Sequence, residues 1–105
     1  MKPKKGNKFS KSSNGSTQLN ELMLRYAQDG QVSNVSGCLL KGADVDYKGG
    51  ALATIAVYIG SSRLLKLVLA HKPEKLKEAL DLAEKADDDK LLAMINDYLK
   101  QSGLE

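Results

Sequence analysis

Gly30 and Gly60 stand at equivalent positions of an internal repeat. When the chain is aligned with itself on these two glycines, apolar residues fall on apolar residues on both sides of the turn. The aligned pairs are Met23 with Ala53, Tyr26 with Ala56, Ala27 with Val57, Val35 with Leu65, Cys38 with Val68 and Leu39 with Leu69. Placing Asp87 on the same turn gives Leu80, Ala83, Leu92 and Ile95 corresponding positions. The pattern predicts three helix pairs of roughly thirty residues, each too small to be stable alone.

The spacing of apolar residues within each copy is that of amphipathic helices. The first helix is expected from about residue 19 to 28, with an apolar face that we list as Leu19, Leu22, Met23, Tyr26 and Ala27. Further helices are expected at 32–39, 51–59, 62–70, 73–86 and 90–102, where Pro73 suits the first position of a helix. Because β-branched and aromatic residues are frequent in LATIAVYI, a strand is the competing prediction at residues 52–59.

Residues 1–18 differ in composition from the rest. They hold five lysines and no acid, and only one aromatic residue, Phe9; the lysines are Lys2, Lys4, Lys5, Lys8 and Lys11. Such a segment buries too little apolar surface to offset its ordering entropy, so we expect a disordered basic tail. Residues 19–105, which are mildly acidic, are expected to form a single all-α domain.

Several classes of function are disfavoured by residue counts. One cysteine, Cys38, and one histidine, His71, provide neither a disulfide nor a zinc ligand set, and no convergent catalytic set is evident. We therefore expect no enzyme activity, no metal and no cofactor. The chain has no apolar run of the ~18 residues that a membrane span needs. A cytoplasmic location is expected, although a serine-rich N-terminus also suits a bacterial secreted effector.

The segment GADVDYKGG, residues 42–50, invites comparison with a phosphate-binding loop. A helix rather than a strand precedes its glycines, and no Gly-Lys-Ser/Thr follows them, so we interpret it as a connection. Asp44 and Asp46 are expected to accept hydrogen bonds from loop amides rather than to act as acid/base or metal-binding carboxylates. The three consecutive aspartates at residues 87–89 are expected to form a turn and a helix N-cap.

The register over residues 19–100 resembles the ankyrin-repeat family. LKGADVD looks like the end of one repeat, and GALATIAVYIGSSRLLKLVLAHK looks like the helical part of the next. Ala51-Leu52-Ala53-Thr54 stands at the family's Thr-Pro-Leu-His signature, where Thr54 replaces the histidine and can still bond to nearby backbone. The resemblance implies an ankyrin-like solenoid of three stacked helix-turn-helix pairs with very short connecting fingers. It also implies a module for protein–protein interaction.

The same resemblance implies which residues contact the partner. The family's concave and finger positions fall here on Tyr47, Lys48, Gly50, Tyr58, Ile59, Gln28 and Asp29. Exposed Tyr and Ile on a rigid surface suit a binding hot spot. The alternative is that Ile59 packs under the short connection and Tyr47 covers a helix end. The partner is expected to be another protein, with the chain as inhibitor, adaptor or effector and with no small-molecule substrate.

A second hypothesis gives the basic tail the main role. Its five lysines would provide affinity for nucleic acid or an anionic surface by counterion release. The tail has no arginine and a single aromatic residue, which limits base stacking and base readout. The protein-binding hypothesis is therefore the preferred one.

Overall fold

The computed structural model describes residues 17–103, and within them the chain forms six helices and no strand. The bounds are α1 Thr17–Gln28, α2 Val32–Leu40, α3 Tyr47–Ile59, α4 Ser62–Ala70, α5 Lys77–Lys85 and α6 Asp89–Ser102. The all-α prediction is confirmed for this part of the chain. The strand alternative for residues 52–59 is wrong, because small residues such as Ala53 and Ala56 let α3 pack closely as a helix.

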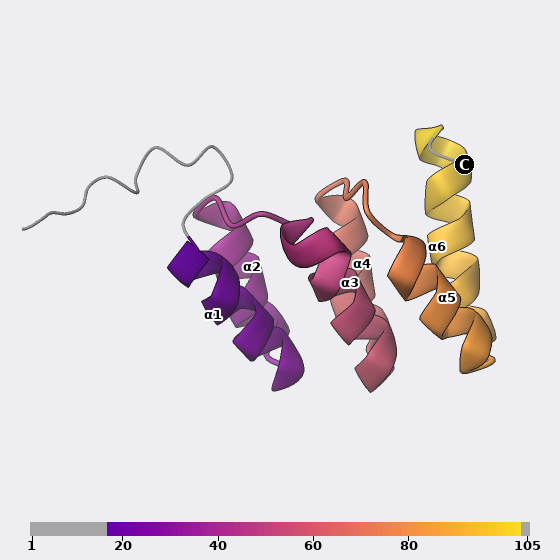
Figure 1. The fold of residues 1–105 in the computed structure, drawn as a ribbon, viewed down its shortest axis with the longest axis horizontal. Helices are drawn as coiled ribbons and strands as arrows, with labels where there is room; N and C mark the ends of the chain where they lie inside the picture. The colour runs from indigo at the N-terminus through magenta and orange to yellow at the C-terminus, as the bar shows by residue number, and fades with distance from the viewer. Residues whose placement is uncertain (1–16, 104–105) are drawn as a thin grey trace, which may run out of the picture.

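The helices lie in two rows, and in Figure 1 the row of α1, α3 and α5 stands in front of the row of α2, α4 and α6. In one row α3 contacts α1 on one side and α5 on the other, and in the second row α4 contacts α2 and α6. Each helix of the first row also contacts its successor in the chain, so that α1 pairs with α2, α3 with α4, and α5 with α6. The resulting body is elongated, with extents of 52 × 29 × 20 Å. The middle pair is therefore covered on both sides.

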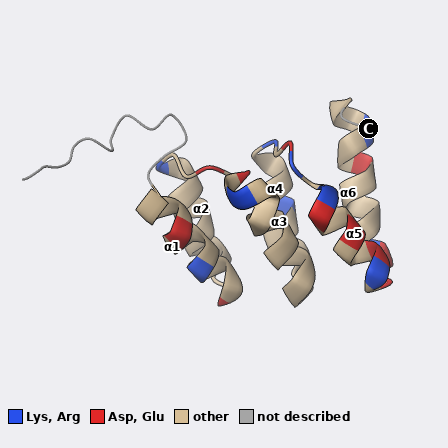
Figure 2. Ribbon diagram, in the orientation of Figure 1, with Lys and Arg blue, Asp and Glu red and all other residues tan. Residues whose placement is uncertain are grey.

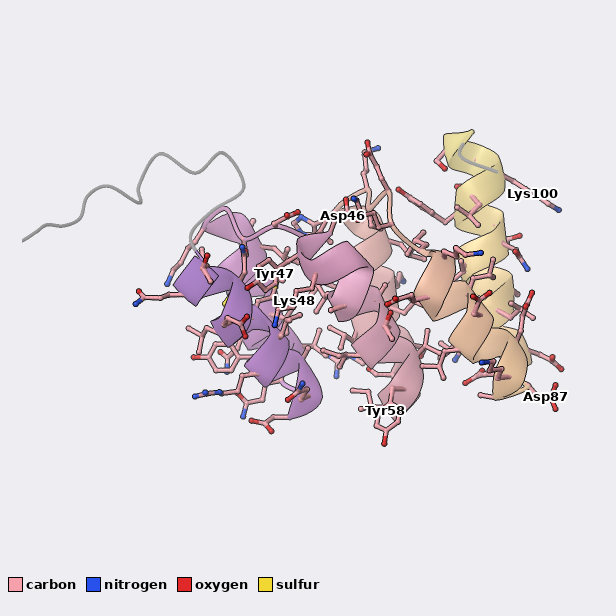
Figure 3. All side chains as sticks on the ribbon, in the orientation of Figure 1. Asp46, Tyr47, Lys48, Tyr58, Asp87 and Lys100 are labelled. Atoms are coloured by element: carbon pink, nitrogen blue, oxygen red, sulfur yellow. The ribbon has the colours of Figure 1, made fainter. Side chains whose placement is uncertain are left out.

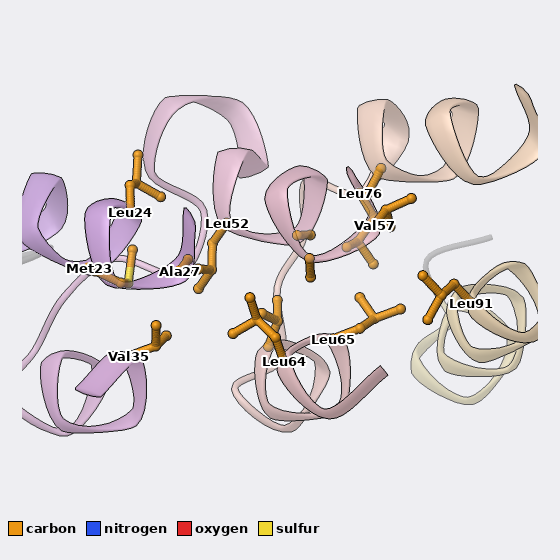
Figure 4. Packing of buried hydrophobic residues seen from close by; sticks show 14 of the residues in the cluster. Met23, Leu24, Ala27, Val35, Leu52, Val57, Leu64, Leu65, Leu76 and Leu91 are labelled. Atoms are coloured by element: carbon orange, nitrogen blue, oxygen red, sulfur yellow. The ribbon is translucent and has the colours of Figure 1, made fainter. Parts of the chain in front are cut away.

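One aliphatic core runs through all three pairs (Figure 4). Its fully buried members include Met23 of α1, Leu52 of α3, Leu64 and Leu65 of α4, and Leu91 of α6. The predicted apolar faces are largely confirmed, with one correction in α1. Leu22 is exposed and Leu24 is buried, because the buried positions of α1 follow the spacing 20, 23, 24 and 27.

The turn inside each pair has the same hydrogen bonding in all three pairs. The amide of Gly30 donates to the carbonyl of Ala27 and the amide of Gln31 donates to that of Tyr26. In the second pair the amide of Gly60 donates to the carbonyl of Val57 and that of Ser61 to the carbonyl of Ala56. In the third pair the amide of Asp87 donates to the carbonyl of Glu84 and that of Asp88 to the carbonyl of Ala83. This Schellman arrangement needs a left-handed residue, and Gly30, Gly60 and Asp87 have φ of 74°, 73° and 54°. The alignment of Gly30, Gly60 and Asp87 therefore matches equivalent backbone geometry.

Helix starts differ from the sequence prediction in two places. The helix expected to begin at Pro73 begins at Lys77, and residues 71–76 form a connection instead. The amides of Glu74 and Lys75 in this connection donate hydrogen bonds to Asp46. Local sequence patterns do not predict this contact, because Asp46 is distant in sequence. At the other end α1 begins at Thr17, two residues inside the range assigned to the tail. The remainder of the tail lies outside the described residues.

The N-cap predicted at residues 87–89 is confirmed, and a serine caps α4 in the same way. The hydroxyl of Ser61 accepts a hydrogen bond from the amide of Leu64, and the carboxylate of Asp88 accepts one from the amide of Leu91. Asn20 lies inside α1 and is 4% exposed. Its Oδ1 accepts a 2.7 Å hydrogen bond from the amide of Asp44, so it joins α1 to the following connection.

Candidate partner-binding surface

Tyr58 and Ile59 lie at the C-terminal end of α3, next to the left-handed Gly60 that ends the helix. Tyr58 is 79% exposed and Ile59 is 38% exposed. In Figure 3 the Tyr58 side chain projects beyond the end of the helix. The two side chains are therefore accessible, as the hot-spot interpretation requires, and Ile59 is only partly covered.

An open groove of about 400 Å³ lies at this end of α3. It crosses the first row of helices, and its lining residues are Gln28 of α1, Thr54, Ile55, Tyr58 and Ile59 of α3, and Leu82 of α5. The structure thus brings three predicted site residues, Gln28, Tyr58 and Ile59, around one hollow. Asp29 follows Gln28 and is exposed, but it does not line the groove.

The groove carries little charge of its own. Residues 49–59 of α3 contain no charged residue, and Figure 2 shows the lower part of this helix without blue or red. Charges lie on the flanking helices, with Arg25 and Asp29 near the end of α1 and Asp81 and Lys85 on α5. An uncharged groove between mixed charges suits an apolar side chain of a partner better than an ionic ligand.

The other predicted anchors, Tyr47 and Lys48, lie at the opposite end of α3, before the regular helix that begins at Ala51 and rises about 10 Å to Tyr58. Both contact Glu21 of α1: the Tyr47 hydroxyl donates to Oε2 at 2.6 Å, and the Lys48 ammonium lies 3.1 Å from the same oxygen. The Lys48 ammonium is also 5.7 Å from the centre of the Tyr47 ring. The seven predicted residues therefore form two separate groups.

The contacts among Glu21, Tyr47 and Lys48 shift the pKa values of Glu21 and Tyr47. The hydrogen bond from Tyr47, and then that from Lys48, lowers the pKa of the Glu21 carboxyl. The same bond to Glu21 raises the pKa of Tyr47 above its ordinary value. Because Tyr47 and Lys48 already have a partner in Glu21, a ligand that uses them must first displace or share these contacts. Tyr58 and Ile59 make no comparable ion pair or side-chain hydrogen bond within residues 17–103, and they are the better anchors.

Gly50 is buried, and its role is structural. A Cβ atom there would lie 1.9 Å from the carbonyl oxygen of Lys75, so the α3 start and the 71–76 connection approach as closely as glycine allows. Gly50 follows Lys48 and Gly49, and all three residues have positive φ. These residues make the turn that leads from the connection into the regular helix at Ala51. We therefore leave Gly50 out of the proposed contact surface.

A chain of hydrogen bonds links the two connections between pairs. Asp44, held by Asn20, accepts a 2.9 Å bond from the Asp46 amide through its Oδ1. The Asp46 carboxylate in turn accepts bonds from the amides of Glu74 and Lys75 at 2.9–3.1 Å. The prediction that both aspartates bond to loop amides is confirmed, and Asp46 reaches further than expected, into the next connection.

The same connection is held from its other side by α6. The Tyr98 hydroxyl donates to the carbonyl of Pro73 at 2.7 Å, and burial, followed by the nearby Asp46 and Glu74, raises the pKa of Tyr98. Beside it lies a wider hollow of about 550 Å³ between α4 and α6. Charged Lys72 and Glu74 line this hollow. It lacks the exposed apolar anchors of the α3 groove.

The reactive side chains are dispersed. Cys38 is buried as a free thiol in α2, and His71 lies at the C-terminal end of α4. Across residues 17–103 no three His, Cys, Asp or Glu side chains are grouped so that they could hold a metal ion. The Thr54 hydroxyl donates to the carbonyl of Gly50 at 3.2 Å, which confirms its predicted backbone bond. None of the helices in this part of the chain has the length and apolarity that crossing a membrane requires.

Three groove residues were not predicted, namely Thr54, Ile55 and Leu82. Ile55 could have been found, since it lies three and four residues before Tyr58 and Ile59 on one helical face. Leu82 lies outside the expected apolar face of its helix. A leucine in that position could have indicated a residue of the binding surface. The tail lysines, Lys2 to Lys11, lie outside the described residues, so the structure does not place them.

Comparisons of this chain with protein-family models, with curated proteins and with solved structures found no match.

Proposed function

We propose that this chain is a non-catalytic module that binds another protein through the outer face of α1, α3 and α5. The observation that carries the proposal is the groove at the end of α3, bounded by the exposed Tyr58 and Ile59. An aromatic and an aliphatic side chain beside an uncharged hollow are typical of binding hot spots. The partner contributes one or two apolar side chains that fill the groove. In this way the chain acts as an inhibitor, adaptor or effector.

We further propose that the three helix pairs form an ankyrin-like stack. Two observations support this: the same hydrogen-bonded turn occurs in each pair, and the first and second helices each contact their counterparts in the neighbouring pair. A third equivalence lies at the ends of the second helices. Gly42 and Lys72 stand thirty residues apart, have φ of 105° and 57°, and donate to the carbonyls of Leu39 and Leu69. In such a stack the first helices carry the partner surface, which agrees with the position of the groove.

The connections make this surface rigid before binding. The Asp46 bonds to Glu74 and Lys75 fix α3 against the start of the last pair, and the contacts of Tyr47 and Lys48 with Glu21 fix it against α1. The groove depends on the spacing of α1, α3 and α5, because each helix contributes lining residues. Prior ordering lowers the entropic cost of binding. A small domain with a modest contact area thereby gains affinity.

A photo-crosslinking experiment tests the proposal. A photoreactive phenylalanine replaces Tyr58 in one variant and Leu40 in a control, since Leu40 is equally exposed at 79% but lies at the end of α2. Illumination in the native cell is expected to yield one predominant protein adduct from position 58 that is absent from position 40. The adduct is identified and its protein purified for affinity measurements. Equal adduct patterns from the two positions would contradict the proposed surface.

A further inference from the structure

The groove suits an occupant smaller than a second folded domain. The large apolar residues exposed in residues 17–103 are Leu22, Leu40, Tyr58 and Ile59, and of these only Tyr58 and Ile59 line it. A stable interface between two folded proteins buries about 800 Å² on each side. Two exposed side chains do not supply such an area for a dimer of this chain. A hollow of about 400 Å³ instead matches one large side chain carried by an extended segment.

The chain itself offers one such side chain. Residues 1–16 precede the described part and include one large apolar ring, Phe9, within the sequence KFSK at residues 8–11. Thr17, where α1 begins, lies eight residues beyond Phe9, and those eight residues span up to about 27 Å when extended. The twelve residues of α1 rise by only about 18 Å from there to Gln28, at the edge of the groove. Phe9 can therefore reach the groove by running alongside α1.

We propose that Phe9 docks between Tyr58, Ile59 and Leu82 and occupies the groove when no partner is bound. One buried ring binds weakly as a free peptide, but a short covalent tether raises its local concentration to the millimolar range. Docking is therefore an intramolecular, readily reversible event. An incoming partner must displace the ring, so that the tail sets a threshold for binding. This inference goes beyond the proposed function and does not depend on the existence of a partner.

The charges around the groove give docking a distinctive salt response. Asp29 and Asp81 lie beside the lining residues, but Arg25 and Lys85 lie one helical turn from Gln28 and Leu82. Attraction of Lys8 and Lys11 to the acids is therefore offset by repulsion from the bases. The ring rather than the lysines holds the tail, and added salt should change docking little. Electrostatic capture of the tail elsewhere on the domain would weaken steeply with salt.

Tryptophan fluorescence tests the proposal in the full chain, which has no tryptophan of its own. Phe9→Trp is compared with Ser13→Trp, which places the same reporter in the tail outside the docking position. We expect the emission of the Phe9→Trp variant to be shifted to shorter wavelength. Its acrylamide quenching constant should be several-fold lower than that of the Ser13→Trp variant. Both effects should persist at high salt and should not change on dilution.

Two second-site changes in the Phe9→Trp background locate the docking site. Tyr58→Ala combined with Ile59→Ser should raise the quenching of the reporter to the level of the Ser13→Trp variant, while Leu40→Ser should leave the reporter protected. Circular dichroism checks that both variants keep their helicity. Equal quenching of the two tail reporters, or protection that survives loss of Tyr58 and Ile59, would overturn the proposal. Protection that disappears on dilution would also overturn it, since a second copy would then be the occupant.

Discussion

The carboxylate of Asp46 accepts a 2.9 Å hydrogen bond from the backbone amide of Lys75, twenty-nine residues further along the chain. It also accepts bonds from the amide of Glu74, so one side chain satisfies two donors of the next connection. Through Asn20 and Asp44 on one side and Tyr98 on the other, this contact belongs to a series that runs from α1 to α6. The three helix pairs are thereby fixed relative to one another by connections as well as by the core.

Removal of the Asp46 carboxylate should destabilise the domain. Asp46→Ala leaves two backbone donors without their acceptor, and we expect a loss of about 2 kcal/mol in the free energy of unfolding. Asp46→Asn keeps one oxygen in place but loses the charge, so about half that loss is expected. Urea denaturation gives both values, and hydrogen exchange should accelerate at the Glu74 and Lys75 amides. Unchanged stability and exchange in Asp46→Ala would show that the contact is dispensable.

Substitutions of Gly50 and Gly49 can be compared to test the close approach between α3 and the 71–76 connection. Both have positive φ, but only at Gly50 would a Cβ atom collide with the Lys75 carbonyl. Gly49→Ala should cost about 1 kcal/mol, from the left-handed backbone alone. Gly50→Ala should cost more than about 3 kcal/mol because the connection must also move. Chemical denaturation of the two variants measures the difference, and equal losses would contradict the assigned contact.

Tyr98 should make stability sensitive to alkaline pH. Its pKa is raised in the folded state, so the stabilisation is fully present below the unfolded pKa of about 10. It is lost as the pH rises through the higher folded value, because the unfolded chain releases the proton more readily. Tyr98→Phe removes the hydroxyl that donates to Pro73, and its unfolding free energy should fall less steeply above pH 10 than that of the wild type. Identical slopes would contradict this role.

The tail lysines distinguish the two functional hypotheses. If the α3 groove carries partner binding, changing Lys2, Lys4, Lys5, Lys8 and Lys11 to Gln should leave the partner's affinity and its salt dependence unchanged. Isothermal titration at two salt concentrations measures both quantities. A large loss of affinity, together with a shallower salt slope, would instead favour a nucleic-acid or anionic-surface role for the tail.

Local sequence signals predicted helices and turns well because their causes are local. Helical spacing predicted buried positions of α2 and α4, and the aspartates at residues 87–89 marked a turn and the N-cap of α6. The start at Pro73 was mispredicted because Asp46, distant in sequence, holds that backbone outside the helix. Local spacing also ranked Leu22 over Leu24, although contacts with neighbouring helices decide which side of α1 is buried.

The candidate surface was predicted in part. Tyr58 and Ile59 were chosen because the resemblance to ankyrin repeats implies contact positions there, and both are exposed at the end of α3. Leu82 joins them only because α5 packs beside α3, a contact between segments that are far apart in sequence. The pairing of Tyr47 and Lys48 with Glu21 is likewise tertiary, and it separates these residues from the groove.

The affinity of the crosslinked partner for a Tyr58→Ala, Ile59→Ser double variant tests the central claim most directly. Both side chains are exposed, so the variant should retain its helicity and cooperative unfolding, with Leu40→Ser as the matched control. We expect the double variant to bind the purified partner at least about thirtyfold more weakly, and the control to bind as the wild type does. An unchanged dissociation constant in a folded double variant would contradict the assignment of the α3 groove as the binding site.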